Sequence, residues 1–144
     1  MRKPWATTPT IAANILSNIA ILRSLHQQTE QDFELILSED GEDAAMRQFI
    51  DNYPFPWQTQ HLTQTDEGWR KNRALNRAIT ASHSDWLIFI DGDCVLHPHF
   101  VEMHIRHKGD GILLAGKRVK LNPALSQQVL AGKQPALFPY LFCR

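Results

Sequence analysis

Cysteine is scarce in this chain of 144 residues, which contains only Cys94 and Cys143. Two cysteines in these positions do not indicate a disulfide framework, and they favour a reducing compartment. No apolar run approaches the roughly 18 residues that a membrane-spanning helix needs. The uncharged stretch after Lys3 holds too many threonines and asparagines for a signal peptide. We therefore expect a cytoplasmic protein, with a peripheral position at the cytoplasmic face of the membrane as the alternative.

An excess of either charge is also missing, because 15 Lys and Arg residues balance 15 Asp and Glu residues. This balance gives no reason to expect a nucleic-acid partner. The sequence contains no internal repeat and no low-complexity segment. What is present is an ordinary globular composition, 43% hydrophobic and 21% charged, with the length of one domain over residues 1–144.

Helix and strand signals alternate along the chain. Short apolar runs indicate strands bounded by turns, and apolar residues at helical spacing indicate helices. Helices are predicted over residues 15–25, 45–53 and 68–84 and from Phe100 onward, and strands over residues 33–37, 59–64, 86–90 and 111–119. This alternation predicts an α/β fold with an open, mostly parallel sheet and flanking helices.

The two ends of the chain lack such signals. Met1–Thr10 contains Pro4 and Pro9 and no apolar run, so the strand that usually opens an α/β domain is not expected there. Residues 120–144, which finish in an apolar and proline-interrupted stretch, have no assigned structure. We therefore expect a fold that is incomplete at both ends.

Two pairs of carboxylates follow predicted strands. Glu39 and Asp40 come after one strand, and Asp91 and Asp93 come after another, with Gly92 between them. Since ligands bind beyond the carboxyl ends of strands in an open parallel sheet, both pairs should lie at one edge. Carboxylates at this spacing suit Mg²⁺ or Mn²⁺, which prefer oxygen ligands. A solvated turn explains either pair alone, but their convergence favours a site.

The predicted helix between these pairs is basic at its start. Arg70, Arg73 and Arg77 fall on one helix face, and Asn72 and Asn76 are one turn apart. Such a helix start is a suitable neighbour for phosphate. A solvated basic face is the alternative explanation for each arginine.

Histidines at positions 97, 99, 104 and 107 raise the question of a zinc site. Pro98 separates the first two, and no cysteine has a suitable spacing, so a zinc site is disfavoured. Cys94 is interpreted as a small core residue rather than a nucleophile, because no activating base can be identified.

Several of these features together resemble one enzyme family. The stretch "QTDEGWRKNRALNRAITASHSDWLIFIDGDCVLHPHFVEMH", with "DFELILSEDG" before it and "GKRV" after it, is similar to the nucleotide-sugar half of family 2 glycosyltransferases of the GT-A fold. The resemblance covers about residues 15–119. It rests on an apolar strand that ends in a D-x-D motif, an asparagine-bearing helix after a glycine turn, and an acidic-glycine motif after an early strand.

The resemblance implies roles for individual residues. Asp93 would coordinate Mn²⁺ or Mg²⁺ at the donor diphosphate, and Asp91 would contact the ribose or the sugar. Asp40, with Glu39 beside it, would reach the base or ribose. Two residues of the basic helix, Arg73 and Asn76, would border the donor.

The implied reaction transfers a sugar from a nucleotide-diphosphate sugar, with a UDP-sugar favoured, to a glycan or lipid-linked acceptor, as in polysaccharide biosynthesis. Family members also have an opening strand and, in inverting members, an acidic general base well after the D-x-D motif. Neither is found here, and Glu102 lies too close to the motif to be that base. We therefore expect a donor-binding half that is shortened or completed by a partner chain. A noncatalytic nucleotide-sugar-binding fragment is the alternative.

A phosphatase of the haloacid-dehalogenase type is a further alternative, because "IFIDGDCV" also fits its D-x-D-x-[T/V] start. There Asp91 would be the nucleophile and Asp93 the acid/base. That family needs a lysine and an acidic pair downstream, whereas this chain offers Lys117, Lys120 and the single Asp110. The upstream "SEDG" and "RALNRAI" segments also have no role in such an enzyme.

Overall fold

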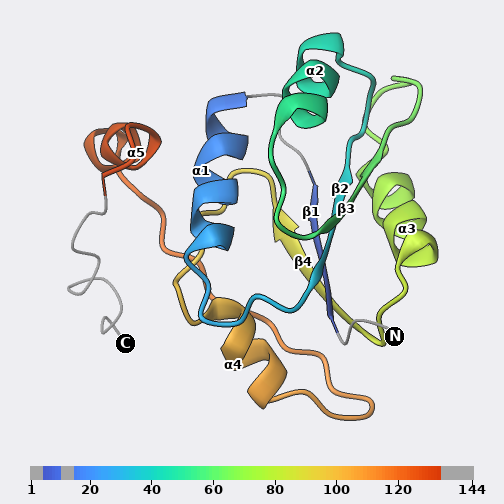
Figure 1. The fold of residues 1–144 in the computed structure, drawn as a ribbon, viewed down its shortest axis with the longest axis vertical. Helices are drawn as coiled ribbons and strands as arrows, with labels where there is room; N and C mark the ends of the chain where they lie inside the picture. The colour runs from blue at the N-terminus through green and yellow to red at the C-terminus, as the bar shows by residue number, and fades with distance from the viewer. Residues whose placement is uncertain (1–4, 11–14, 134–144) are drawn as a thin grey trace.

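A four-stranded parallel sheet with helices on both faces forms the centre of the protein (Figure 1). The structure is a computed structural model that describes residues 5–10 and 15–133. The elements are β1 (Trp5–Thr10), α1 (Ile15–His26), β2 (Glu34–Ser38), α2 (Ala44–Asn52), β3 (Gln58–Leu62), α3 (Lys71–Ala81), β4 (Trp86–Asp91), α4 (Phe100–Arg106) and α5 (Pro123–Leu130).

The strand order is β3-β2-β1-β4, and this order explains the two helical layers. Connections between parallel strands are right-handed, so the direction of each step along the sheet decides which face its helix covers. The steps from β1 to β2 and from β2 to β3 run one way and place α1 and α2 on one face. The step from β3 to β4 runs back and places α3 on the other face (Figure 1).

The prediction that the chain lacks an opening strand is wrong. Residues Trp5–Thr10 form β1 in the middle of the sheet, hydrogen-bonded to β2 on one side and to β4 on the other. Strand formation depends on pairing as well as on the local pattern. Pairing with two neighbouring strands therefore outweighs the missing apolar run.

The strand register aligns the four carboxyl ends. Thr10 pairs with Ser38 on one side and with Asp91 on the other, and Ser38 pairs with Leu62. One row across the sheet therefore contains the last residue of every strand. Asp91 lies in this row, and Asp93, Glu39 and Asp40 follow it within two residues, which confirms that the two acidic pairs share one edge.

The main hydrophobic core lies between the sheet and helices α1, α2 and α4. Alternate residues of the strands point into it, and each buried aliphatic or aromatic side chain contributes roughly 1.5–3 kcal/mol. Its buried members are Ile21, Leu22, Leu25, Phe33, Leu35, Leu37, Met46, Ile50, Trp57, Ile88, Ile90 and Val101.

The opposite face has a smaller core beneath α3. Ala74 and Ala78 are fully buried, and Ile36 from β2 packs against Ala78. Small side chains allow α3 to approach the sheet closely. This close approach matters for the site, because the first turn of α3 lies at the acidic edge.

The segment after α4 differs from the sequence-based prediction. Residues 111–119 were expected to form a strand, but they have no regular structure, and Leu113 is 93% exposed. An apolar run does not become a strand unless a neighbouring strand pairs with it. Helix α5 follows within the unassigned residues 120–144, and residues 134–144 lie outside the described chain. None of the described helices has the length and apolar character that crossing a membrane requires.

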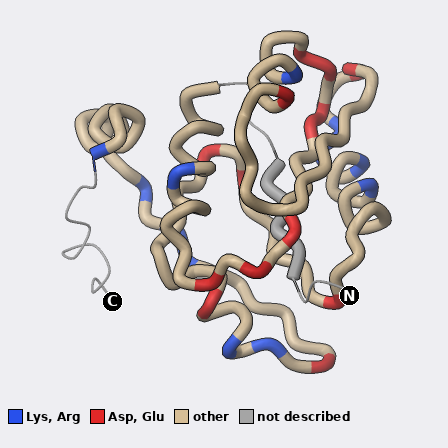
Figure 2. The backbone as a smooth tube through the Cα atoms, in the orientation of Figure 1, with Lys and Arg blue, Asp and Glu red and all other residues tan. Residues whose placement is uncertain are grey.

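Charged residues of both signs are interspersed over the described chain (Figure 2).

One acidic side chain, Glu34, lies at the sheet edge opposite the acidic pairs and is only 2% exposed. Its Oε1 accepts hydrogen bonds of 2.8 Å from Ser82 Oγ, Ser84 Oγ and the His83 backbone N–H. Burial alone would raise the pKa of Glu34, but these hydrogen bonds outweigh it and lower the pKa. Glu34 therefore holds the end of α3 as a carboxylate.

Glu34→Gln should make the protein less stable and less sensitive to acid. Because folding lowers the pKa of Glu34, its contribution is complete above the unfolded pKa and disappears as pH falls through the folded pKa. We expect a loss of about 2 kcal/mol near pH 7, typical of hydrogen bonds to a charged group. The loss should shrink at pH 3, as measured by urea unfolding at both values. Glu42→Gln is the control, because Glu42 is at an exposed position. If Glu34→Gln lowered the free energy of unfolding equally at both pH values, this role of Glu34 would be contradicted.

Candidate functional site

The D-x-D motif forms a turn directly after β4. The Cys94 backbone N–H donates to the Asp91 carbonyl at 3.0 Å, and Gly92 is buried inside the turn. Ligand atoms of Asp91, Asp93 and Cys94 lie within 4.8 Å of one another. The strand order reverses between β1 and β4, and crevices at such a switch point are where open parallel sheets bind ligands.

The two aspartates suit a hard divalent cation, whereas the cysteine does not. Mg²⁺ and Mn²⁺ take carboxylate oxygens and leave other positions to water and substrate phosphates. Burial raises the pKa of the Cys94 thiol, and the neighbouring carboxylates of Asp93 and Asp91 raise it further. Cys94 therefore stays a neutral thiol that packs against the core. Asp91 and Asp93 are the residues that would hold an ion.

Two cationic side chains already contact Asp91. Lys71 Nζ donates to Asp91 Oδ1, and Arg118 Nη1 lies 3.5 Å from Asp91 Oδ2. Lys71 is the first residue of α3, and Arg118 comes from the irregular segment after α4. Neither residue was predicted from the sequence to have a role in the site. Lys71 directly follows Arg70 at the basic helix start, and this position is the feature of the sequence that could have indicated its role.

Asp40 fixes the start of α3. Its Oδ2 accepts the Arg70 backbone N–H at 2.7 Å, and its Oδ1 accepts a hydrogen bond from Gln64 Nε2. Gly68 turns the chain into this position with a φ of +87°, which other residues adopt only with strain. Asp40, in the loop after β2, therefore holds the residue that precedes α3, while its carboxylate stays at the acidic edge.

Glu39 is placed differently from Asp40. It is 7% exposed, and its Oε2 lies 3.1 Å from Nε2 of His61, the penultimate residue of β3. Its backbone N–H donates to the Leu62 carbonyl at 2.8 Å. The structure thus brings Asp40, Asp91 and Asp93 to the open edge and turns Glu39 inward beneath β3.

Most of the chain matches a family of known proteins. The family described as Glycosyl transferase family 2 matches residues 19–126. The chain belongs to this family. Its fold is accordingly of the GT-A type, and the parallel α/β sheet agrees with that assignment.

The family 2 chain is also similar to a hyaluronan synthase of Pasteurella multocida, with 22% identity over 103 residues. The matched region covers 70% of this chain and 11% of the synthase. The chain thus spans about a ninth of the length of this curated relative.

In the family 2 chain, Arg77 rather than Arg73 makes the hydrogen bonds that join the strand ends beside the site. Arg77 is half-buried beneath the ends of β2 and β3, and its burial lowers the pKa of the guanidinium. Arg73 is 63% exposed in its side chain and lies 3.7 Å from Glu67. Asn76 is exposed, on the side of α3 away from Ala74 and Ala78. Arg77 donates to the carbonyls of Glu39, Leu62 and Thr63, to Gln64 Oε1 and to Ser38 Oγ.

The segment after the D-x-D motif is held by the end of α1. Ser24 Oγ accepts the Leu96 N–H at 3.1 Å, and the Gln28 side chain accepts the Val101 N–H and donates to the His97 carbonyl, both at 2.9 Å. Gln28 is only 5% exposed. These polar contacts have no visible sequence pattern, because they join residues about 70 positions apart.

The histidines near the motif contact other groups. His99 Nδ1 lies 2.9 Å from Glu102 Oε2, and Thr29 donates to the same oxygen at 2.7 Å. Among the described residues, the one metal-compatible group is the Asp91, Asp93 and Cys94 group. The histidines therefore add no argument for zinc.

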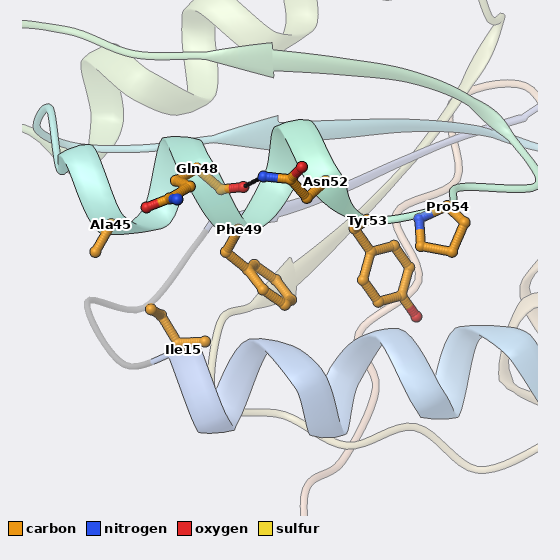
Figure 3. A pocket seen from close by; sticks show the side chains of 7 residues that line it. All are labelled: Ile15, Ala45, Gln48, Phe49, Asn52, Tyr53 and Pro54. Atoms are coloured by element: carbon orange, nitrogen blue, oxygen red, sulfur yellow. Dashed lines mark hydrogen bonds between the residues drawn. The ribbon is translucent and has the colours of Figure 1, made fainter.

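A pocket of about 450 Å³ lies between α1 and α2 (Figure 3). Phe49 and Tyr53 point from α2 toward α1 and form its floor (Figure 3). None of the carboxylates of the site lines it. Its lining residues are Ile15, Ala45, Gln48, Phe49, Asn52, Tyr53 and Pro54.

Arg77→Met should destabilise the family 2 chain by about 3 kcal/mol, because removing the partner of several buried acceptors costs the penalty of leaving them unpaired. Arg73→Met on the same helix is the matched control and should change stability by less than about 0.5 kcal/mol. Urea unfolding of both variants measures the difference. Equal losses would show that the contacts of Arg77 do not hold the strand ends together.

Proposed function

We propose that this chain binds a nucleotide-diphosphate sugar through a divalent metal and serves in transfer of the sugar to a glycan or lipid-linked acceptor. The observation that carries the proposal is the D-x-D turn at the switch point of the sheet in a family 2 chain. The phosphatase alternative explains the turn, but not the family match over residues 19–126.

Asp93 is the proposed principal ligand of Mn²⁺ or Mg²⁺. Its side chain is exposed, and the Cys94 thiol donates a weak hydrogen bond of 3.5 Å to its Oδ1. A carboxylate in this state can take a cation without breaking a strong bond. A bound ion would neutralise a diphosphate and stabilise it as a leaving group.

Asp91 and Asp40 are the proposed donor contacts, Asp91 for the ribose or sugar and Asp40 for the base or ribose. A carboxylate has about four lone-pair positions, so Asp40 can accept a further hydrogen bond beside those from Gln64 and Arg70. Glu39 is better suited to shaping the edge through His61. Arg73 and Asn76 would reach a donor that extends over the outer side of α3.

Transfer also requires a base that takes the proton of the acceptor hydroxyl as it attacks the anomeric carbon. Residues 94–133 offer no carboxylate placed for this role, so we assign the base to a part of the enzyme outside this segment or to a partner chain. The similarity to a hyaluronan synthase supports a polysaccharide product. We propose a UDP-sugar as the donor. We place the reaction in the cytoplasm, where such donors are available.

Noncatalytic binding of a nucleotide sugar is the second candidate. This candidate is favoured because no general base is assigned among the residues that the structure describes after the D-x-D turn. Both candidates use the same donor site, so binding cannot separate them, whereas release of the nucleoside diphosphate from a panel of donor sugars can.

The donor site is tested by thermal melting with UDP, GDP, CDP and dTDP, each with and without Mn²⁺. A ligand at 100 times its dissociation constant adds about 2.7 kcal/mol of stability, which shifts melting by several degrees in a chain of this size. We expect a metal-dependent shift, largest with UDP, that Asp93→Asn abolishes.

Asp110→Asn provides the matched control, since Asp110 is an exposed carboxylate away from the turn. It should keep the full shift. A cooperatively melting protein that shows no shift with any of the four nucleotides would contradict the proposed donor site.

A further inference from the structure

Both carboxylate oxygens of Asp91 face a positive charge. Lys71 Nζ donates to Oδ1, and Arg118 Nη1 lies 3.5 Å from Oδ2. The two cations come from different parts of the chain, Lys71 from the first position of α3 and Arg118 from the irregular segment after α4. Their meeting at one carboxylate is therefore a product of the tertiary structure.

The local charges cancel at this point. Asp91 and Asp93 contribute two negative charges, and Lys71 and Arg118 contribute two positive charges. A divalent cation that enters alone therefore meets a cluster with no net charge. It is repelled by Lys71 and Arg118 and must displace them from Asp91 in order to bind there. A diphosphate that enters with the cation restores the balance, because it brings negative charge for the metal and for both side chains.

Resting on the proposed donor site, we propose that Lys71 and Arg118 are counter-cations that occupy Asp91 until a metal-bound diphosphate takes them over. They make metal binding weak in the absence of nucleotide and make metal and nucleotide bind together. Ammonium and guanidinium groups form their strongest hydrogen bonds with phosphate and carboxylate, so both can exchange one partner for the other.

The two residues differ in how firmly they are held. The backbone at the start of α3 is fixed by the hydrogen bond from the Arg70 N–H to Asp40, which places Lys71 beside Asp91. Arg118 is 79% exposed on a segment without regular structure. Lys71 is therefore the more firmly positioned of the two cations, and Arg118 is the freer one to change its partner.

A role in fold stability alone would predict little effect on ligands. The side chains of Lys71 and Asp91 are 33% and 41% exposed. Ion pairs at such positions stabilise proteins weakly. Fold stability therefore does not explain the ion pair between Lys71 and Asp91, whereas exchange of Asp91 for an anionic ligand does.

The test measures Mn²⁺ binding by electron paramagnetic resonance of the free ion, and UDP binding at saturating Mn²⁺ by calorimetry. The proteins are the full chain, Lys71→Met, Arg118→Met and the control Lys117→Met, which removes an exposed charge next to Arg118. Melting curves establish that each variant folds.

We expect opposite signs for the two ligands. Lys71→Met should bind Mn²⁺ alone about fivefold more tightly and UDP about tenfold more weakly, within the usual range of coupling between two sites. Arg118→Met should change both affinities in the same directions but less, and Lys117→Met should change neither by more than about twofold.

Affinities that fall together, or that do not change, would overturn the counter-cation role and leave Lys71 as a structural residue. The Mn²⁺ measurement needs no nucleotide, so it still decides the matter if the protein binds no UDP. In that case the proposed function fails, but the Mn²⁺ affinity still tests this inference. Tighter Mn²⁺ binding by Lys71→Met would support the counter-cation role, and unchanged or weaker binding would overturn it.

Discussion

The start of α3 is tied to the ends of two strands that are not neighbours in the sheet. Asp40, after β2, accepts the Arg70 backbone N–H, and Lys71, the next residue, donates to Asp91 at the end of β4. One turn of helix thereby links both acidic motifs across β1. If this link were displaced by one residue, the charges around the D-x-D turn would change. The electrostatics of the site therefore depend on where α3 begins.

The frame around this link combines rigid and adaptable parts. Arg77 joins the ends of β2 and β3 through their carbonyls, and Ser24 and Gln28 hold the segment that follows the D-x-D turn. Asp93 and the Arg118 segment remain exposed. A site that must accept and release a charged ligand needs this division, because preorganised groups supply affinity while exposed ones can exchange partners.

Family membership and local chemistry support each other at different levels. The family match identifies the fold and the general type of site. The contacts show how the site is balanced, with two carboxylates opposite two cations and a neutral thiol beside them. A resemblance between sequences carries residues over by position, and therefore it draws attention to Arg73 and Asn76 but not to Lys71.

The sequence by itself determined the α/β class, most helix and strand positions, and the convergence of the acidic pairs at one edge. These follow from apolar periodicity and from the rule that parallel strands end together, both of which are local or topological. Only the tertiary structure decided that Trp5–Thr10 is a central strand, that residues 111–119 are not a strand, and that Arg77 is half-buried while Arg73 is exposed. The physical reason is that pairing partners and burial come from segments distant in the chain, and no local pattern records which cation will meet Asp91.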